Sequence, residues 1–215
     1  HRMLDFVAQR VGGAPALTIV NGATFVGGAS APGAIVSAFG SNVDFTRFLP
    51  AGPDASLVSV RDSAGNIRNA RVLGVAAGQV NFVIPENSAQ GPATVIVNGP
   101  ANLTQALDLK AAVPGLFSAT NDGRGRAAAQ VLRAGGEVYA VLFATGIRNV
   151  TGANRLVVRV NGVDAKVDYF GAQGEFPGLD QINVRVPASE AAKDTVSVTV
   201  LAEGQAATAL QVPLR

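Results

Sequence analysis

The stretch QVNFVIP at residues 79–85 returns as QINVRVP at residues 181–187. In both copies a glutamine comes first, apolar residues occupy the second, fourth and sixth positions, and a proline ends the stretch. Alternation with period two predicts a β-strand that turns one face to a core. The proline predicts the strand end, because proline has no N–H for a sheet ladder. A strand pattern that occurs twice in one chain indicates an internal duplication.

Two further pairs of segments occur in the same order. AIVSAFGSNV (34–43) is similar to AVLFATGIRNV (140–150), aligned on Gly40 and Gly146, and GPATVIVNG (91–99) is similar to KDTVSVTVLAEG (193–204). Glycine after an apolar strand permits a positive φ or a close backbone approach. Gln79 and Gln181 are expected to hydrogen-bond the backbone at a strand start. We therefore give all these repeated residues, with Pro85 and Pro187, a structural role.

Other short runs rich in Val, Ile and Thr are bounded by turn residues about every ten positions, which is typical of a β-sandwich. Turn signals include AGG at 134–136 and NG at 161–162. We predict an all-β chain of two tandem immunoglobulin-like β-sandwiches behind a short N-terminal arm. The predicted boundaries are 1–18 for the arm, 19–110 for the first sandwich and 111–215 for the second.

The predicted core anchors are large apolar residues of the repeated strands: Phe39, Val83, Ile84 and Val95 in the first copy, and Phe143, Val184 and Val198 in the second. Val83 and Ile84 are adjacent in their strand, so they point to opposite faces. We therefore expect one of the two to contact the other sandwich or a partner.

The composition excludes several classes of protein. Of 215 residues, 48% are hydrophobic and 15% charged, which allows a core and does not fit a disordered chain. The net charge is only +2, and GRGR at 123–126 is interpreted as a turn, so no nucleic-acid partner is predicted. No apolar run is long enough for a membrane span. The absence of cysteine excludes disulfides and thiolate metal sites.

Segments throughout the chain after residue 18 resemble a known family: IVNGATF (19–25), APGAIVSAFGSNV (31–43), GQVNFVIP (78–85), GPATVIVNG (91–99), VPGLFSATNDGRGRAAA (113–129), VLFATGI (141–147), VNGVDAKVDYFG (160–171) and LDQINVRVP (179–187). Together they look like the Solibacter-type C-terminal module of secreted acidobacterial proteins. The resemblance implies paired immunoglobulin-like sandwiches on an exported protein that is secreted or held at the cell surface. The family has no established catalytic residues, so it implies no site.

Residues that could carry chemistry are sparse. The single histidine is His1 and there is no cysteine, so nucleophilic catalysis is not expected. Asp164, Asp168, Glu175 and Asp180 are close in sequence, but we interpret them as solvated charges. The NDG segment at 121–123 lacks the spacing of an EF-hand. We predict no enzyme activity, no cofactor and no metal site.

Aromatic platforms for sugar binding are also few, because there is no tryptophan and there are two tyrosines. The ten phenylalanines are mostly assigned to strands and to the core.

Two non-enzymatic functions are left open. The first is a self-assembling subunit of an extracellular surface fibre, joined through apolar residues of the N-terminal arm: Met3, Leu4, Phe6, Val7 and Val11. Such an arm could add a strand to a neighbouring subunit, or turn back through GGAPA (12–16) onto its own sandwich. The alternative is a C-terminal adhesion or display module of a larger secreted protein, with an unknown ligand. Self-association is the predicted partnership in the first case.

Overall fold

A computed structural model describes residues 16–48, 56–99 and 102–215. The described residues form an all-β structure with two short 3-10 turns, and none of their helical segments could cross a membrane. The elements are β1 (Ala16–Asn21), β2 (Ala29–Ser30), β3 (Ile35–Ser41), η1 (Phe45–Arg47), β4 (Val58–Arg61), β5 (Ile67–Asn69), β6 (Arg71–Ala76), β7 (Gln79–Val83), β8 (Gly91–Val97), β9 (Leu103–Leu109), β10 (Gly115–Leu116), β11 (Ala129–Ala134), β12 (Glu137–Thr145), η2 (Ala153–Arg155), β13 (Leu156–Val160), β14 (Val163–Ala172), β15 (Asp180–Arg185), β16 (Thr195–Ala202), β17 (Gln205–Ala206) and β18 (Leu210–Pro213).

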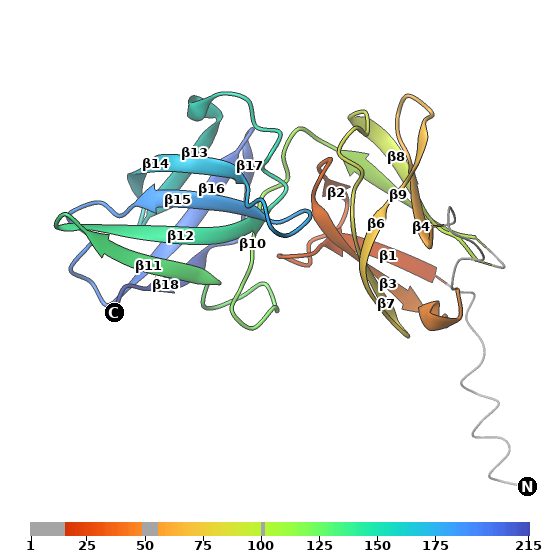
Figure 1. Cartoon of the computed structure of the whole chain (residues 1–215), viewed down its shortest axis with the longest axis horizontal. Helices are drawn as coiled ribbons and strands as arrows, with labels where there is room; N and C mark the ends of the chain where they lie inside the picture. Colours follow the sequence, from red (N-terminus) through yellow and green to blue (C-terminus); the bar gives the residue numbers. More distant parts are fainter. Residues whose placement is uncertain (1–15, 49–55, 100–101) are drawn as a thin grey trace, which may run out of the picture.

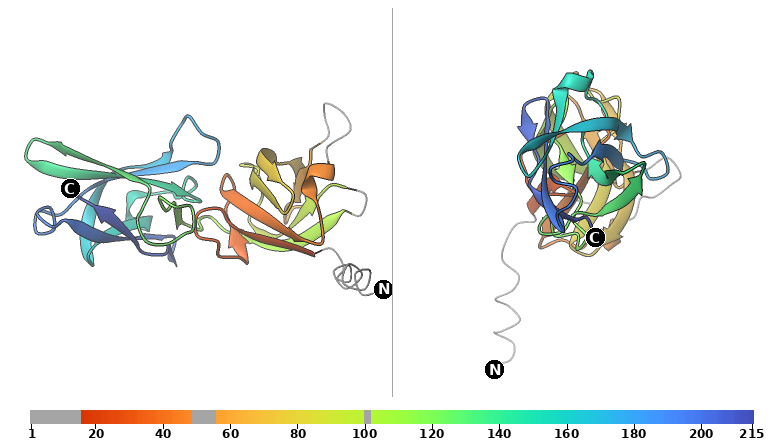
Figure 2. Two further views of the ribbon diagram at one scale, coloured as in Figure 1. Left: turned by 90° about the horizontal axis from the view of Figure 1, so that it is seen from below. Right: turned by 90° about the vertical axis from the view of Figure 1, so that its left-hand side faces the viewer.

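The strands gather into two halves that lie end to end (Figures 1 and 2). The C-terminus lies in the second half, away from the junction of the two (Figure 1). The predicted arm residues Met3, Leu4, Phe6, Val7 and Val11 lie outside the described residues. Strand β1 begins at Ala16, inside the range assigned to the arm, and Leu17 is buried in the first half.

The N-terminal half, residues 16–109, packs two sheets around one core. One sheet has the order β1-β3-β7-β6 and the other β2-β9-β8-β4-β5, in which β2 runs parallel to β9. Alternate side chains of both sheets point inward, among them Val36 and Phe82 from the first sheet and Val60 and Val95 from the second. These four are fully buried, so the packing of the two sheets removes a continuous apolar surface from water.

The C-terminal half, residues 112–215, has a second, separate core. Its strands follow the order β10-β12-β15-β14-β13-β16-β17, with β11 paired to β12 and β18 paired to β16. Strand β14 pairs first with β13 and then with β15, so it passes from one layer to the other. In the N-terminal half β5 and β6 do the same, separated only by Ala70. Leu142, Ile182, Val198 and Leu210 are among the buried core residues.

Tight hairpin turns form where the sequence predicts them. The turn between β11 and β12 has φ of 60° at Gly135 and 81° at Gly136, and the turn between β13 and β14 has 48° at Asn161 and 84° at Gly162. Positive φ at both central residues is the geometry whose twist matches that of paired strands, and Gly and Asn adopt it most readily. The turn signals AGG and NG are therefore confirmed.

The repeated stretch forms β7 in one half and β15 in the other. In each, the outward-facing Gln donates through Nε2 to Oδ1 of the Asn two positions on, at 2.8 Å for Gln79 and Asn81 and 2.8 Å for Gln181 and Asn183. Each glutamine thus bonds an asparagine side chain, and the prediction that it bonds the backbone is wrong. The partner strand on one side also carries a register shift in each half, in β6 and in β14.

Strand register corrects one detail of the predicted duplication. Phe39 pairs with Gln79, and Phe143 pairs with Gln181, so the two phenylalanines are equivalent. Gly40 therefore corresponds to Ala144, and its alignment with Gly146 is wrong by two residues.

The strand register also shows that two predicted core anchors are wrong. Phe39 and Phe143 are only half-buried, whereas their neighbours Ala38 and Leu142 are buried in the cores. Side chains alternate along a strand, so a register that turns the neighbours inward turns the phenylalanines outward. Phe39 packs near Phe25 on the outer face, with ring centroids 6.3 Å apart. The anchors Ile84, Val95, Val184 and Val198 are confirmed, each fully buried.

Val83 and Ile84 point to different sides of their strand, as predicted. Ile84 belongs to the core of the N-terminal half, while Val83 is buried outside that core. Val83 instead faces Gly178 of the C-terminal half, where a methyl group added to the glycine would lie 2.9 Å from Val83 Cγ2. The expectation that one of the two contacts the other half is confirmed.

Candidate functional site

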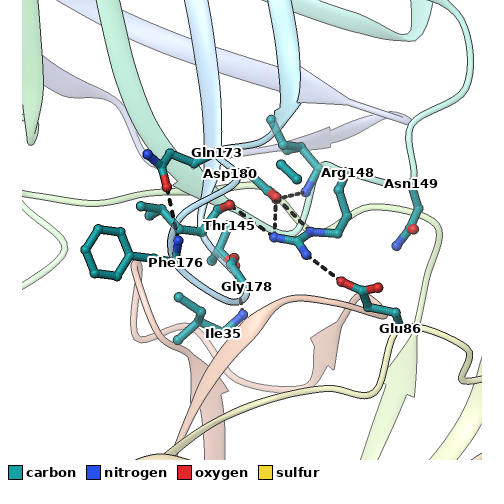
Figure 3. Close-up of polar contacts among 12 residues, drawn as sticks. Ile35, Glu86, Thr145, Arg148, Asn149, Gln173, Phe176, Gly178 and Asp180 are labelled. Carbon is teal, nitrogen blue, oxygen red and sulfur yellow. Dashed lines mark hydrogen bonds and ion pairs between the residues drawn. The ribbon is translucent and has the colours of Figure 1, made fainter. Parts of the chain in front are cut away.

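The ends of the two halves meet in a joint built from loops and strand ends. The N-terminal half contributes residues 21–35 and 83–86, and the C-terminal half contributes residues 113–123, 145–149 and 178–180. Figure 3 shows the polar part of this joint, in which side chains of both halves converge.

Arg148 lies at the centre of the joint (Figure 3). Its Nε and Nη2 atoms each lie 2.9 Å from Oδ1 of Asp180, and Nη1 donates to Oε1 of Glu86 at 2.7 Å. The exposed fractions of the side chains are 12% for Arg148, 0% for Asp180 and 65% for Glu86. One guanidinium therefore joins a buried carboxylate of its own half to an exposed carboxylate of the other half.

Asp180 is the buried charge of the joint. Burial raises the pKa of its carboxyl from 3.8 to about 6, while the Ile147 N–H and Arg148 favour the charged form and act in the opposite direction. The Ile147 N–H donates to Oδ2 at 2.9 Å. Asp180 begins β15 and points inward, like Ile182 and Val184 further along that strand. The interpretation of Asp180 as a solvated charge is therefore wrong.

Thr145 ties both halves through one hydroxyl. Its Oγ1 accepts from the Ile35 N–H of the N-terminal half at 2.8 Å and donates to the Gly178 carbonyl of its own half at 2.8 Å. Thr145 is fully buried. A buried hydroxyl with both a donor and an acceptor partner fixes strand β3, which supplies Ile35, relative to the turn before β15, which supplies Gly178.

Two asparagine side chains also form hydrogen bonds between the halves. Asn149 donates through Nδ2 to the Pro32 carbonyl at 2.6 Å, and Asn21 donates through Nδ2 to the Val113 carbonyl at 3.2 Å. Oδ1 of Asn21 also accepts from the Ala23 N–H at 2.9 Å, which shapes the turn after β1. Each side chain thus bonds the backbone of the other half, so the joint is fixed at several places at once.

Two glycines allow the halves to touch. A Cβ on Gly178 would lie 2.5 Å from Cγ1 of Ile35, and its φ of +78° already disfavours any other residue. A Cβ on Gly115 would lie 2.4 Å from Oδ1 of Asn21. Larger residues at either position would push the halves apart.

A groove opens on one flank of the joint, with a volume of about 430 Å³. The lining is uncharged. Its apolar members are Phe25, Ile35, Leu73 and Phe117, its polar members are Ser37, Gln79, Asn81 and Asn121, and Gly22 completes the lining. Phe117 and Asn121 come from the C-terminal half, so both halves build this flank groove.

The other acidic residues singled out in the sequence do not join Asp180. Asp164 pairs with Arg159 at 2.8 Å, Asp168 pairs with Lys166 at 3.1 Å, and Glu175 is exposed. Over residues 16–48, 56–99 and 102–215, no three or more His, Cys, Asp or Glu side chains are grouped as metal ligands. In the NDG turn, Asp122 accepts from the Ser118 hydroxyl at 3.0 Å.

Sequence reasoning missed Asn21, Thr145, Arg148 and Asn149 as joint residues. They lie inside segments that the sequence had already marked, namely IVNGATF and AVLFATGIRNV. The signal was the short polar run that follows an apolar strand in each segment. Its role depends on the opposite half, which no local pattern describes.

No family model and no curated protein matches the chain. Among solved structures, the chain is similar to SGBP-B of the Bacteroides ovatus mixed-linkage glucan utilization locus, solved in complex with a mixed-linkage heptasaccharide, with 13% identity and a TM-score of 0.37. The match covers 86% of this chain and 43% of that one, so the chain spans less than half of its length. A likeness at this level says nothing about what the present chain binds.

Proposed function

We propose that the chain is a non-catalytic display module of an exported protein, in which two immunoglobulin-like sandwiches are locked into one rigid unit. The observation that carries the proposal is the joint, where Arg148 connects buried Asp180 to Glu86 of the other half. Linked domains move relative to each other by default unless their interface holds them. A fixed interface serves a module whose task is to hold a surface in a set orientation.

Strand order supports the immunoglobulin-like assignment. In such domains one sheet contains strands A, B, E and D, and the other contains C, F and G. The order β1-β3-β7-β6 corresponds to A-B-E-D, and β9-β8-β4 corresponds to G-F-C. In the second half β10-β12-β15-β14 and β18-β16-β13 follow the same two orders.

The resemblance to the Solibacter-type module supports export, and the joint gives that resemblance a physical meaning. The segments IVNGATF and VPGLFSATNDGRGRAAA meet through Asn21 and Val113, and APGAIVSAFGSNV meets VLFATGI through Ile35 and Thr145. The quoted segments therefore include those that hold the two halves together. Assembly through the N-terminal arm remains a prediction, because the arm lies outside the described residues.

Display is tested on intact cells of the organism that makes the protein. An antibody raised against the folded chain should bind unbroken cells or the culture medium, because an exported module is accessible from outside. Added protease should remove the signal from cells while a cytoplasmic marker survives. Detection only after the cells are broken would contradict the proposal.

A further inference from the structure

We propose that the flank groove binds a neutral oligosaccharide, an inference that rests on the proposed display function and names its ligand class. A volume of about 430 Å³ falls within the usual range of small-molecule sites, roughly 300–1,000 Å³. The groove combines two aromatic rings with a row of amide and hydroxyl groups. Sugars need this combination, since a pyranose ring has an apolar C–H face and a rim of hydroxyls.

The polar floor of the groove is preorganised. Oδ1 of Asn81 accepts from the Ser37 hydroxyl at 2.8 Å and from Nε2 of Gln79 at 2.8 Å. These bonds hold the three side chains in a fixed row across β3 and β7 and commit the carbonyl end of Asn81 to the protein. The Nδ2 group of Asn81 is then the donor that this row can offer to a hydroxyl.

The aromatic wall is held in an unusual conformation. Phe25 has φ of 59°, a region that bulky residues rarely adopt, and its side chain is 37% exposed. Bonds from the Phe25 N–H to the Asn21 carbonyl at 2.9 Å and from the Asn21 N–H to the Val26 carbonyl at 2.9 Å keep it there. Backbone strain that holds an exposed aromatic beside a groove is typical of a binding site. The assignment of the phenylalanines mainly to the core does not hold for Phe25.

The second wall is brought from the other half. Phe117 precedes, and Asn121 lies within, a turn in which the Ser118 hydroxyl accepts the N–H groups of Asp122 and Gly123, both at 3.0 Å. A Cβ on Gly123 would lie 3.0 Å from the Thr24 carbonyl oxygen, so this turn is seated directly against the loop that carries Phe25. The rigid joint therefore fixes the distance between the two walls.

Other classes of ligand fit the lining less well. A phosphate or an acidic ligand would need a cation, and no charged residue lines the groove. An extended peptide that adds to the sheet would pair with the edge strand β6, which contributes Leu73 to the lining, whereas the polar row lies on β3 and β7, which are already paired on both sides. In the C-terminal half the position equivalent to Val83 is Arg185, which binds Glu137 at 2.8 Å, so the corresponding row there ends in charge.

The test is calorimetric titration of the full chain with cellohexaose, xylohexaose, mannohexaose and a galactose hexasaccharide at millimolar concentration, with hexagalacturonic acid as the charged comparison. We expect at least one neutral sugar to bind and the acid not to bind. Phe25→Asn removes the ring and keeps a residue that tolerates the left-handed backbone, so it should weaken binding about tenfold or more. The matched control is Phe176→Asn, a 65% exposed phenylalanine outside the groove, which should leave the affinity unchanged.

A second variant distinguishes loss of binding from loss of folding. Leu73→Asn removes an exposed apolar wall on the edge strand β6 and should weaken binding several-fold without changing the thermal midpoint. No binding of any neutral sugar, equal binding of the acid, or unchanged affinity in Phe25→Asn would overturn the proposal. If no sugar binds, and an uncharged peptide binds to the parent but not to Phe25→Asn in the same titration, the groove is a peptide site instead. Failure of sugar binding in a protein that intact cells display removes only the ligand, whereas absence from the surface removes the display function.

Discussion

Replacing Arg148 with methionine should destabilise the protein by about 3–5 kcal/mol near pH 8, because it leaves the buried Asp180 carboxylate without its charge partner. Methionine keeps most of the apolar stem, so the loss reports the guanidinium. Urea denaturation at fixed pH measures the free energy of unfolding. The matched control is Arg159→Met, which breaks the exposed pair with Asp164 and should change stability by no more than about 1 kcal/mol.

The cost of Arg148→Met should also depend on pH. The folded-state pKa of Asp180 is raised from 3.8 to about 6, so its stabilising contribution is fully present below pH 3.8 and is lost as pH rises through about 6. Without Arg148 the pKa of Asp180 rises further, because the cation no longer favours the charged form. The variant should therefore lose less stability relative to the parent at pH 5 than at pH 8. An equal loss at both pH values, or a loss no larger than that of Arg159→Met, would contradict the assigned role of this pair.

Replacing Phe82 with alanine should destabilise the protein by about 3–5 kcal/mol, because Phe82 is fully buried between the sheets of the N-terminal half. The same change at Phe39 should cost only about 1 kcal/mol, since Phe39 is half-buried on the outer face and loses mainly its contact with Phe25. Denaturant unfolding of both variants gives the comparison. A larger loss at Phe39 than at Phe82 would restore the original assignment of Phe39 to the core and contradict the observed register.

Local patterns predicted the all-β architecture because alternation, proline strand ends and glycine turns are properties of neighbouring residues. The pair Asn161 and Gly162 is a clear example, since its turn type depends on two residues alone. The same patterns did not show which face of every strand points to the core. Phe39 lies in a continuously apolar run, where hydrophobicity does not reveal which alternate residues face the core.

The joint could not be predicted from local patterns. Arg148 and Asp180 are separated along the chain, and Arg148 gains its second partner, Glu86, only when the halves meet. Asp180 follows a turn, where an acidic residue is usually solvated, and only tertiary packing buries it. The flank groove has the same origin, because Phe25 and Phe117 come from different halves.

The joint is expected to hold the two halves as one rigid unit. The chain has no cysteine, so two introduced cysteines can carry one spin label in each half. Thr104→Cys in the N-terminal half and Gln130→Cys in the C-terminal half are both at exposed positions. Gly178→Ala should disrupt the joint, because its Cβ would lie 2.5 Å from Ile35 Cγ1 and 2.9 Å from Val83 Cγ2. Gly174→Ala is the matched control, with φ of +99° and no atom within 4 Å of the added Cβ.

Double electron–electron resonance between the two labels is the most direct measurement. A rigid joint predicts one narrow distance distribution in the doubly labelled parent, the same distribution in Gly174→Ala, and a broadened or shifted one in Gly178→Ala. A broad or multimodal distribution in the parent would contradict the claim that the joint fixes the two halves.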